Sequence, residues 1–459
     1  MIRVLHVYVP KRLLLLVVSE AALMVLALVS TAYALFGPDA ELMLAYEGGL
    51  YKIVLVAAIS LCCMHYYDLY EANVIYSAAE VLTRLIQVLG TVVLILALVY
   101  YLYPAAQLGR RMVVAWVVLA GVLLALWRGL FCKLNSSSRL RHRAVLLGTG
   151  PLAAEIAREV HTHRELGILL DGFVAQEGDK PEVEGIRCLG GIEDLPDLAM
   201  NGQYRHIIVT LQERRGRMPV EMLLQLKAHG VRVQDGADVY EAVTGKVPLD
   251  SLRLGWLLFS PGFKVSRWTL FYKRISSLLI SSAALLIAFP LMIVIALVIR
   301  LESAGPVIFR QQRVGLDGKI FTLFKFRTMV SGSNPDQPSR IHDRRCTRIG
   351  RWLRLLHLDE LPQLYNVLRG DMHFVGPRPF TPMLESEYRE KIPFYSQRWV
   401  VRPGITGWAQ IHRGYCETVE DNKEKLSYDL FYIKNMSMGL DMVILLETIK
   451  VLLLGRGSR

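Results

Sequence analysis

Long apolar stretches near the start of the chain constrain its fold most strongly. Residues 13–36, 53–67, 85–106 and 112–127 are almost free of charged side chains. About 20 helical residues span the hydrocarbon core of a bilayer, and the shorter stretches can extend into their flanks. The pattern predicts a multi-pass membrane protein with a four-helix transmembrane domain at 1–138.

Basic residues around these stretches give their orientation. Lys11 and Arg12 precede the first stretch, and Arg139, Arg141 and Arg143 follow the fourth. Because positive charge is retained on the cytoplasmic side, both ends of the bundle are predicted to be cytoplasmic.

One acidic residue, Glu20, lies inside the first apolar stretch. An ionisable group at this depth is costly, and it is retained either for a function or for a polar contact between helices. The contact is the commoner reason, so we expect a partner on another helix.

The chain as a whole is basic. It has 53 Lys+Arg against 41 Asp+Glu, a net charge of +12. Such a surface suits nucleic acid, anionic lipid or a phosphorylated substrate. Because the basic residues adjoin apolar segments, we expect no nucleic-acid partner. The six cysteines form no C-x-x-C pair, which argues against a zinc ribbon or a disulfide scaffold.

A second domain is indicated by a glycine turn after an apolar strand. Residues 144–150 read Ala-Val-Leu-Leu-Gly-Thr-Gly, and Gly148, Gly150 and Ala153 fit the pattern G-x-G-x-x-A. Glycines there let the backbone turn beside a pyrophosphate at a helix N-terminus. The pattern predicts a Rossmann-like α/β domain at 139–247, with Gly148 and Gly150 as a candidate nucleotide loop.

Two observations weaken the nucleotide interpretation of this turn. The same motif often serves only to pack a strand against a helix. The acidic residue that would hold a ribose is ambiguous between Glu165 and Asp171.

Residues 275–299 are uncharged and long enough for a fifth span. Lys273 and Arg274 precede them and Arg300 follows, so both ends prefer the same side of the membrane. Pro290 removes a helix hydrogen bond in the middle and bends the chain. We therefore predict a re-entrant helix, broken at Pro290, that returns to the cytoplasmic face. A kinked true span is the alternative.

A mostly helical catalytic domain is predicted at 273–459, after a linker at 248–272. From 300 to 380 there are 14 Lys+Arg against seven Asp+Glu, which suits phosphate groups of a lipid or a substrate. Three arginines recur at a spacing of three and predict a basic stripe on a helix in the membrane interface: Arg348, Arg351 and Arg354. Residues 440–454 also suit an interfacial helix.

Adjacent carboxylates at Asp359 and Glu360 stand just before Pro362, which is tolerated only near the start of a helix. A helix from about Asp359 or Glu360 through Leu368 would place free N–H groups beside the carboxylates. That combination suits a phosphate with Mg²⁺. One carboxylate could attack phosphorus while its neighbour holds the metal. Four nearby cations in the sequence are candidate phosphate ligands: Lys325, Arg327, Arg354 and Arg378.

Five motifs in the same order resemble those of the bacterial sugar transferase family, the monotopic polyprenyl-phosphate hexose-1-phosphate transferases. They lie at 305–311 (Gly-Pro-Val-Ile-Phe-Arg-Gln), 324–329 (Phe-Lys-Phe-Arg-Thr-Met), 358–363 (Leu-Asp-Glu-Leu-Pro-Gln), 376–379 (Gly-Pro-Arg-Pro) and 402–410 (Arg-Pro-Gly-Ile-Thr-Gly-Trp-Ala-Gln). The domain order resembles the long form of the family, similar to undecaprenyl-phosphate galactose or glucose phosphotransferases.

The resemblance implies an enzyme on the cytoplasmic face of the bacterial inner membrane. It would transfer a hexose 1-phosphate from a UDP-sugar to undecaprenyl phosphate and release UMP, the first membrane step of exopolysaccharide, O-antigen or capsule assembly. The resemblance implies Asp359 as the nucleophile of a covalent aspartyl-phosphosugar intermediate and Glu360 as its Mg²⁺-binding neighbour. It also implies Arg354 and Arg378 as phosphate contacts and Pro290 as the break of the re-entrant helix.

The sequence departs from the family pattern in three respects. Ser276 and Ser277 replace a usual acidic residue, while Phe289 and His357 replace usual serines. The departures concern the geometry of the re-entrant anchor and leave the carboxylate pair intact.

Two other functions stay open from the residues alone. One is a catalytically inactive membrane scaffold or regulator of polysaccharide biosynthesis. The other is a nicotinamide-dependent enzyme using Gly148 and Gly150, although its domain has no visible Tyr-x-x-x-Lys. The sequence does not distinguish among hexose donors, and two four-span domains could pair as a homodimer.

Overall fold

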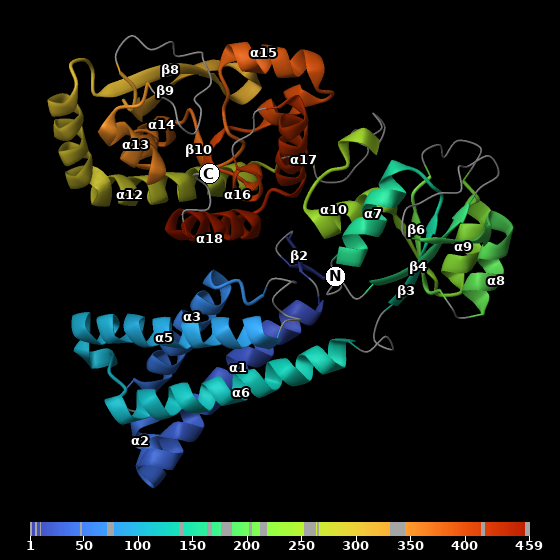
Figure 1. Cartoon of the computed structure of the whole chain (residues 1–459), viewed down its shortest axis with the longest axis horizontal. Helices are drawn as coiled ribbons and strands as arrows, with labels where there is room; N and C mark the ends of the chain where they lie inside the picture. Colours follow the sequence, from blue (N-terminus) through green and yellow to red (C-terminus); the bar gives the residue numbers. More distant parts are fainter. Residues whose placement is uncertain are drawn as a thin grey trace. The chain divides into compact units, whose positions relative to one another are not determined.

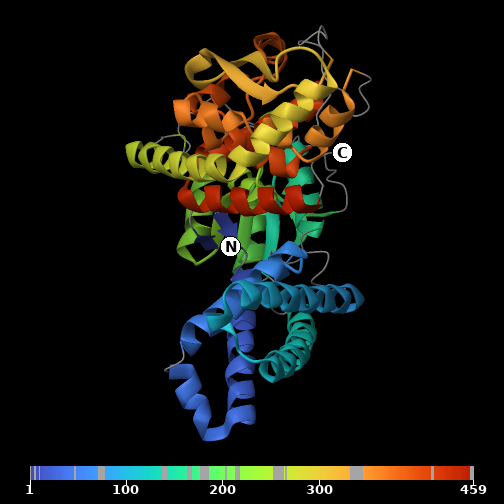
Figure 2. The same cartoon turned by 90° about the vertical axis from the view of Figure 1, so that its left-hand side faces the viewer.

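The structure is a computed structural model. It describes residues 2–4, 7–9, 11–45, 48–70, 78–136, 142–162, 168–175, 186–201, 204–211, 218–251, 263, 266–330, 345–414 and 418–454. The chain forms two compact units that divide between Gly236 and Ala237, except that residues 3–7 group with the second unit. Figures 1 and 2 show the elements of both units from two sides.

Four long helices dominate the N-terminal part: α1 (Lys11–Phe36), α3 (Gly49–Tyr66), α5 (Ala78–Leu102) and α6 (Arg110–Ser136). They are four of the five described helices that are long and apolar enough to cross a membrane. Shorter elements accompany them: β1 (Ile2–Val4), β2 (Val7–Val9), η1 (Gly37–Asp39), α2 (Ala40–Ala45) and η2 (Pro104–Ala106). The apolar stretches of the sequence thus form helices.

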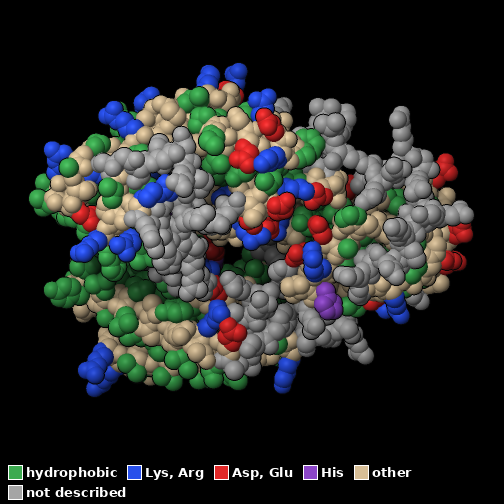
Figure 3. All heavy atoms as spheres, turned by 45° about the horizontal axis from the view of Figure 1, so that its top comes forward, with side chains coloured by type: hydrophobic (Ala, Val, Ile, Leu, Met, Phe, Trp, Pro, Cys, Tyr) green, Lys and Arg blue, Asp and Glu red, His purple; other side chains and the backbone are tan. Residues whose placement is uncertain are grey.

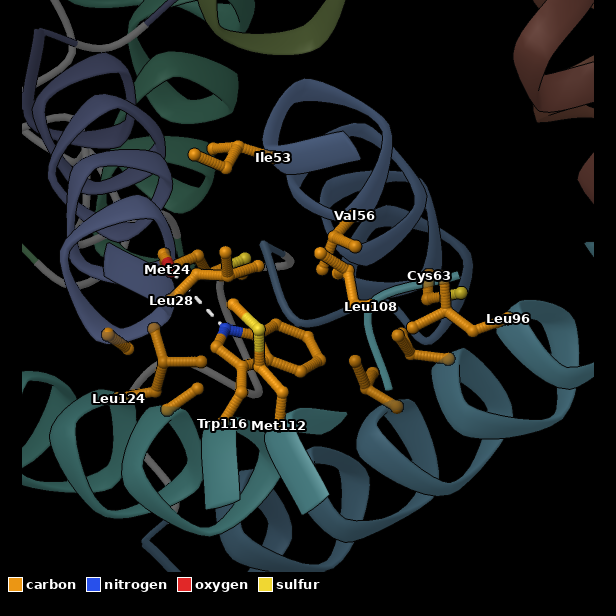
Figure 4. Close-up of a cluster of buried hydrophobic side chains, with 14 of the residues drawn as sticks. Met24, Leu28, Ile53, Val56, Cys63, Leu96, Leu108, Met112, Trp116 and Leu124 are labelled. Atoms are coloured by element: carbon orange, nitrogen blue, oxygen red, sulfur yellow. Dashed lines mark hydrogen bonds between the residues drawn. The ribbon is translucent and has the colours of Figure 1, made fainter. Parts of the chain in front are cut away.

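The helices of this bundle share a buried apolar core (Figure 4). Trp116 of α6 lies in it, and its indole Nε1 donates to the carbonyl oxygen of Met24 in α1 at 3.3 Å. Glu20 and Arg128 form a buried ion pair between the same two helices, with 2.6 Å between Oε1 and Nε. Glu20 therefore makes the polar contact between helices that its position in the sequence favoured.

A five-stranded parallel sheet follows the bundle, in the order β5-β4-β3-β6-β7. Its strands are β3 (His142–Leu147), β4 (Ile168–Ala175), β5 (Arg187–Gly191), β6 (His206–Val209) and β7 (Arg232–Asp235). Its described helices are α7 (Pro151–Thr162), η5 (Ile192–Asp194), α8 (Leu195–Met200) and α9 (Val220–Ala228). This order is that of a Rossmann-like domain, as the glycine turn predicted.

The second unit contains α12 (Arg267–Glu302), which has Pro290 in its interior. The predicted interruption at Pro290 is wrong in one respect, because the helix continues through it. Its ribbon nevertheless changes direction within its length in both views (Figures 1 and 2). Proline produces a bend without ending a helix when the neighbouring turns keep their hydrogen bonds.

Burial along α12 is uneven. Near its start Lys273 and Ser277 are buried, and near its end Ile299 is 2% exposed. Between them, Leu286 and Ile287 are 78% and 80% exposed. Apolar side chains gather at the left edge of the molecule in Figure 3, on the side where Figure 1 draws the bend of α12. The two ends of the helix are thus packed, while its middle presents apolar groups outward.

Short strands and helices surround α12 in the second unit. The strands are β8 (Ile308–Val314) and β9 (Ile320–Phe326), paired antiparallel, and β10 (His373–Val375) and β11 (Gly404–Thr406), paired parallel. The helices are α13 (Arg348–Leu355), α14 (Gln363–Arg369), α15 (Pro382–Lys391), α16 (Trp408–His412), α17 (Val419–Asn435) and α18 (Met438–Leu454). Short 3-10 turns are η6 (Leu249–Ser251), η7 (Leu316–Gly318), η8 (Leu358–Glu360) and η9 (Tyr395–Val400).

The segment α10 (Gly236–Thr244) also packs in the second unit, apart from its first residue. Glu241 accepts hydrogen bonds from Lys434 of α17 at 2.9 and 2.8 Å, and both side chains are buried. The indole of Trp408 donates to the carbonyl oxygen of Gly245 at 2.9 Å. The predicted boundary at 247 stays a prediction. Much of the predicted linker, 252–262 and 264–265, lies outside the described residues.

Candidate active site

The Asp359–Glu360 pair lies in a tight turn between two helices. His357 takes a left-handed conformation (φ 54°) after α13, and η8 follows it. The amides of Leu361 and Leu364 each donate to the carbonyl three residues earlier, and α14 begins only after Pro362. The expected helix from Asp359 or Glu360 through Leu368 is therefore confirmed from Gln363 onward, where α14 lies, and is wrong at its start. A 3-10 turn occupies its start.

Glu360 is held by two cations from different elements. Its Oε1 accepts from Lys325 Nζ of β9 at 2.7 Å and from Arg378 Nη2, in the loop after β10, at 2.8 Å. Burial alone would raise the pKa of this carboxyl, but Arg378 and Lys325 outweigh it and hold the pKa of Glu360 well below its usual range. Glu360 is therefore a permanent anion that fixes two cations.

Asp359 has a different environment from its neighbour. The residue is only 8% exposed, and burial raises the pKa of its carboxyl. Lys325 and Arg354 act to lower that pKa, whereas the charge of Glu360 raises it. Within the described part of the chain, no group donates a hydrogen bond to the Asp359 carboxylate. It is therefore a buried carboxylate without the tight pairing that occupies Glu360.

The other two predicted phosphate ligands have distinct positions. Arg354 of α13 donates from Nε to Thr328 Oγ1 at 2.9 Å, and its charge acts on Asp359. Arg327 instead donates to the carbonyl oxygens of Ser303 and Ala304 just beyond α12, at 2.7 and 3.1 Å. The structure thus brings Lys325, Arg354 and Arg378 to the carboxylates, while the guanidinium of Arg327 contacts the end of α12.

Several residues that the sequence did not single out support this arrangement. Asn366 of α14 is fully buried, accepts from the amide of Phe324 at 3.1 Å and donates to the carbonyl of Thr322 at 2.7 Å. Those contacts fix β9, and with it Lys325, against the helix that follows the carboxylates. No local pattern predicts these contacts, because Phe324 and Thr322 lie more than 40 positions away from Asn366.

The glycine turn of the α/β domain is explained by packing. Gly148 has φ +102°, and a Cβ there would lie 2.8 Å from the side chain of Leu211 and 3.2 Å from its backbone. Asp171 pairs with Arg143 at 2.5 Å in mid-strand, away from the turn at the carboxyl end of β3. It is therefore poorly placed to hold a ribose. Glu165, the other candidate, lies outside the described residues.

The carboxylate pair can be tested as a magnesium site by its chemistry. Mg²⁺ is commonly held by one or two carboxylates together with substrate phosphates. Among the described residues, no group of three or more His, Cys, Asp and Glu could hold a metal ion. Among the same residues, no group donates a hydrogen bond to the Asp359 carboxylate or to Oε2 of Glu360. Both fit a magnesium ion that completes its coordination with phosphate and water.

The Asp359–Glu360 pair among three cations suits a phosphorylated substrate, and the same unit contains a long apolar helix. These features fit the class of membrane-associated proteins that act on phosphorylated substrates. Comparison with known proteins refines that class. The family model "Bacterial sugar transferase" matches residues 268–455, and the model "CoA-binding domain" matches residues 65–234.

Three similar proteins are named for the same kind of reaction. UDP-N-acetylgalactosamine-undecaprenyl-phosphate N-acetylgalactosaminephosphotransferase of Aeromonas hydrophila is 37% identical over 61% of this chain and 63% of its own length. UDP-glucose:undecaprenyl-phosphate glucose-1-phosphate transferase of Xanthomonas campestris pv. campestris is 32% identical over 75% of each chain. Undecaprenyl-phosphate glucose phosphotransferase of Komagataeibacter xylinus is 35% identical over 68% of this chain and 59% of its own length.

The chain therefore belongs to the bacterial sugar transferase family. The matched stretch spans less than two thirds of the Aeromonas and Komagataeibacter proteins.

Proposed function

We propose that the chain transfers a hexose 1-phosphate from a UDP-sugar to undecaprenyl phosphate and releases UMP. The observation that supports this most is the Asp359–Glu360 pair among Lys325, Arg354 and Arg378. Three cations and two carboxylates leave a net positive site, which suits a diphosphate. The names of the similar proteins supply the two substrates.

In the first step, a carboxylate oxygen of Asp359 attacks the β-phosphorus of the UDP-sugar. The bond between that phosphorus and the bridging oxygen breaks, and UMP leaves with the bonding electrons. The sugar phosphate stays esterified to Asp359. Glu360 holds Lys325 and Arg378 in place at fixed distance, so both cations face the negative charge that grows on the phosphates without prior reorganisation.

In the second step, a phosphate oxygen of the polyprenyl phosphate attacks the same phosphorus and releases the Asp359 carboxylate. Two displacements replace one direct reaction between two large anions. Bound Mg²⁺, which Asp359 and Glu360 would hold, supplies charge neutralisation at the phosphates.

In this proposal, four membrane-spanning helices and a re-entrant α12 anchor the chain in the membrane. Lys273 and Arg274 stand near one end of α12 and Arg300 near the other, and the middle of the helix is exposed and apolar. Both ends then lie on the cytoplasmic face of the inner membrane, where the soluble donor meets the lipid acceptor. A polyprenyl phosphate can reach the carboxylates only if they lie close to the bilayer surface.

The test is UMP release by the full chain, with undecaprenyl phosphate and a panel of UDP-sugars, with and without Mg²⁺. Asp359→Asn removes the nucleophile and Glu360→Gln releases the two cations, so each variant should lose product formation by at least about 10³-fold. Lys391→Met, at an exposed ion pair on α15, is the matched control.

The outcomes separate the proposal from its rival. Full activity in Asp359→Asn would remove the nucleophile assignment. No UMP release from any donor by the wild-type chain would favour an inactive scaffold. A sugar phosphate adduct on Asp359, trapped with the donor alone and located by mass spectrometry, would support the two-step route.

A further inference from the structure

Hydrogen bonds from both side chains and backbone amides fix the loop that carries Arg378. Pro377 and Pro379 have no N–H, so the loop can be anchored mainly through its carbonyls. Gly404 N donates to the carbonyl of Pro377 at 2.9 Å, and Val314 N donates to that of Phe380 at 3.0 Å. The two carbonyls between them accept from arginines.

Those arginines come from distant positions. Arg398 Nη2 donates to the carbonyl oxygen of Arg378 at 2.8 Å. Arg313 Nη1 donates to the carbonyl oxygen of Pro379 at 3.0 Å. Four consecutive carbonyls, from 377 to 380, thus each have a donor. The conformation of the loop, and so the direction in which Arg378 points, depends on these contacts.

Arg398 makes several contacts besides its hydrogen bond to the loop. It is 4% exposed, and its guanidinium contacts Asp429 at 2.9 Å, Glu385 at 3.3 Å and the Tyr395 hydroxyl at 2.7 Å. It also lies over the ring of Phe380, 4.8 Å from the centroid. A guanidinium with acceptors on several sides has essentially one orientation, which makes it a rigid support for the Arg378 carbonyl.

We propose that Arg398 is a positioning residue, which holds the Arg378 backbone so that its guanidinium meets Glu360 and the donor phosphates. This rests on the proposed transfer reaction. Arg398 contacts neither Glu360 nor Asp359 in the structure, and it acts through one carbonyl oxygen. Its two carboxylate partners neutralise its charge, so its effect is orientation rather than attraction of substrate.

Arg398→Lys separates orientation from charge. Lysine keeps the positive charge that Glu385 and Asp429 need, but it has no planar fork and cannot reach all the acceptors. We expect a melting temperature close to that of the wild type and a loss in kcat/KM of about tenfold or more, since a hydrogen bond to a charged donor is removed. Tyr395→Phe removes only the hydroxyl that orients the guanidinium, and we expect a smaller loss of about threefold.

A double-mutant cycle distinguishes positioning from general support of the fold. If Arg398 acts through Arg378, Arg398→Lys should cost less than about twofold in an Arg378→Met background. Equal losses in both backgrounds would overturn the proposal, because the residue would then act elsewhere. Wild-type kcat/KM in Arg398→Lys would overturn it as well. Lys391→Met again serves as the control.

Backbone amide hydrogen exchange tests the positioning role of Arg398 without measuring enzymatic activity. A peptide covering 376–380 has only three amides, at Gly376, Arg378 and Phe380. We expect faster exchange there in Arg398→Lys and unchanged exchange in Lys391→Met. Unchanged exchange in Arg398→Lys would overturn the positioning role even if the chain released no UMP from any donor. Absence of UMP release alone would refute only the proposed reaction.

Discussion

His373 of β10 is a buried histidine close to three cations. Burial, together with the charges of Lys273, Arg402 and Arg274, lowers the pKa of His373 to about 3. Its Nδ1 lies 3.4 Å from Ser277 Oγ of α12. The imidazole is therefore neutral in the fold at every pH at which the protein is expected to work.

This neutral histidine predicts a pH dependence of stability. In the unfolded chain the group titrates near 6.5, so below that pH the unfolded state binds a proton that the folded state refuses. The contribution of His373 to the free energy of unfolding is fully present above about pH 6.5. It falls by roughly 1.4 kcal/mol per pH unit as the pH drops toward 3. We expect His373→Asn to show a shallower loss of melting temperature between pH 7 and 5 than the wild type.

The comparison needs a histidine that lacks this environment. His229→Asn, at an exposed position after α9, should keep the acid slope of the wild type. If His373→Asn and wild type lost melting temperature equally between pH 7 and 5, the neutral state of His373 in the fold would be refuted.

At the scale of elements, a buried ion pair joins α10 to α17. Glu241 is 1% exposed and contacts Lys434 through both oxygens. Glu241→Gln should destabilise the second unit by about 3 kcal/mol or more, because the buried lysine loses the carboxylate that contacts it through both oxygens. Asp238→Asn is the matched control, since that carboxylate is 3.9 Å from the same Nζ and 57% exposed. Thermal unfolding of both variants checks the order.

Equal losses of melting temperature in the two variants would contradict this explanation. If Asp238→Asn lowered the melting temperature as much as Glu241→Gln, the loss of stability would come from the change in surface charge and not from the buried Glu241–Lys434 pair. The Glu241–Lys434 contact would then not be what fixes α10 to α17.

The elements themselves could be predicted wherever the pattern was local. Apolar runs predicted α1, α3, α5 and α6, and the glycine turn predicted a parallel sheet, because both depend on a few adjacent residues. The turn at Asp359 was mispredicted as a helix, since the left-handed residue at 357 is a histidine rather than a glycine. Histidine takes that conformation more often than most non-glycine residues, but too rarely to predict a turn by itself.

Long-range contacts could not be predicted in this way. Arg398 and Asn366 lie at the site because of partners from other elements, and neither belongs to a short motif with a known spacing. The same holds for Arg327, whose place beside Lys325 suggested a phosphate contact, whereas its guanidinium reaches the carbonyls beyond α12. Alternation along a strand would put residues 325 and 327 on the same face, but β9 ends at Phe326 and Arg327 lies beyond it.

For the whole molecule, the main prediction concerns the membrane topology of α12. If the helix is re-entrant, single cysteines at Ser266 and Lys319, which flank it and are exposed, should react with an impermeant maleimide from the same side. A cysteine at Asp39, between α1 and α3, should react from the opposite side. The assay uses intact spheroplasts and inverted vesicles of a variant without the six native cysteines.

A true span gives a different labelling pattern. Reaction of Ser266→Cys and Lys319→Cys from opposite sides would refute the re-entrant proposal, and the second unit would then be divided by the membrane. The Asp39→Cys variant verifies that the membranes are sealed and oriented.

The hydrogen-bonded carbonyls of residues 377–380 affect how the loop can bind the UDP-sugar. Carbonyl oxygens carry partial negative charge, and a pyrophosphate is repelled by any that point toward it. All four oxygens from 377 to 380 are engaged by donors within the protein. The loop can therefore present its cation to an anionic substrate with little of the opposing dipole that an ordinary turn would expose.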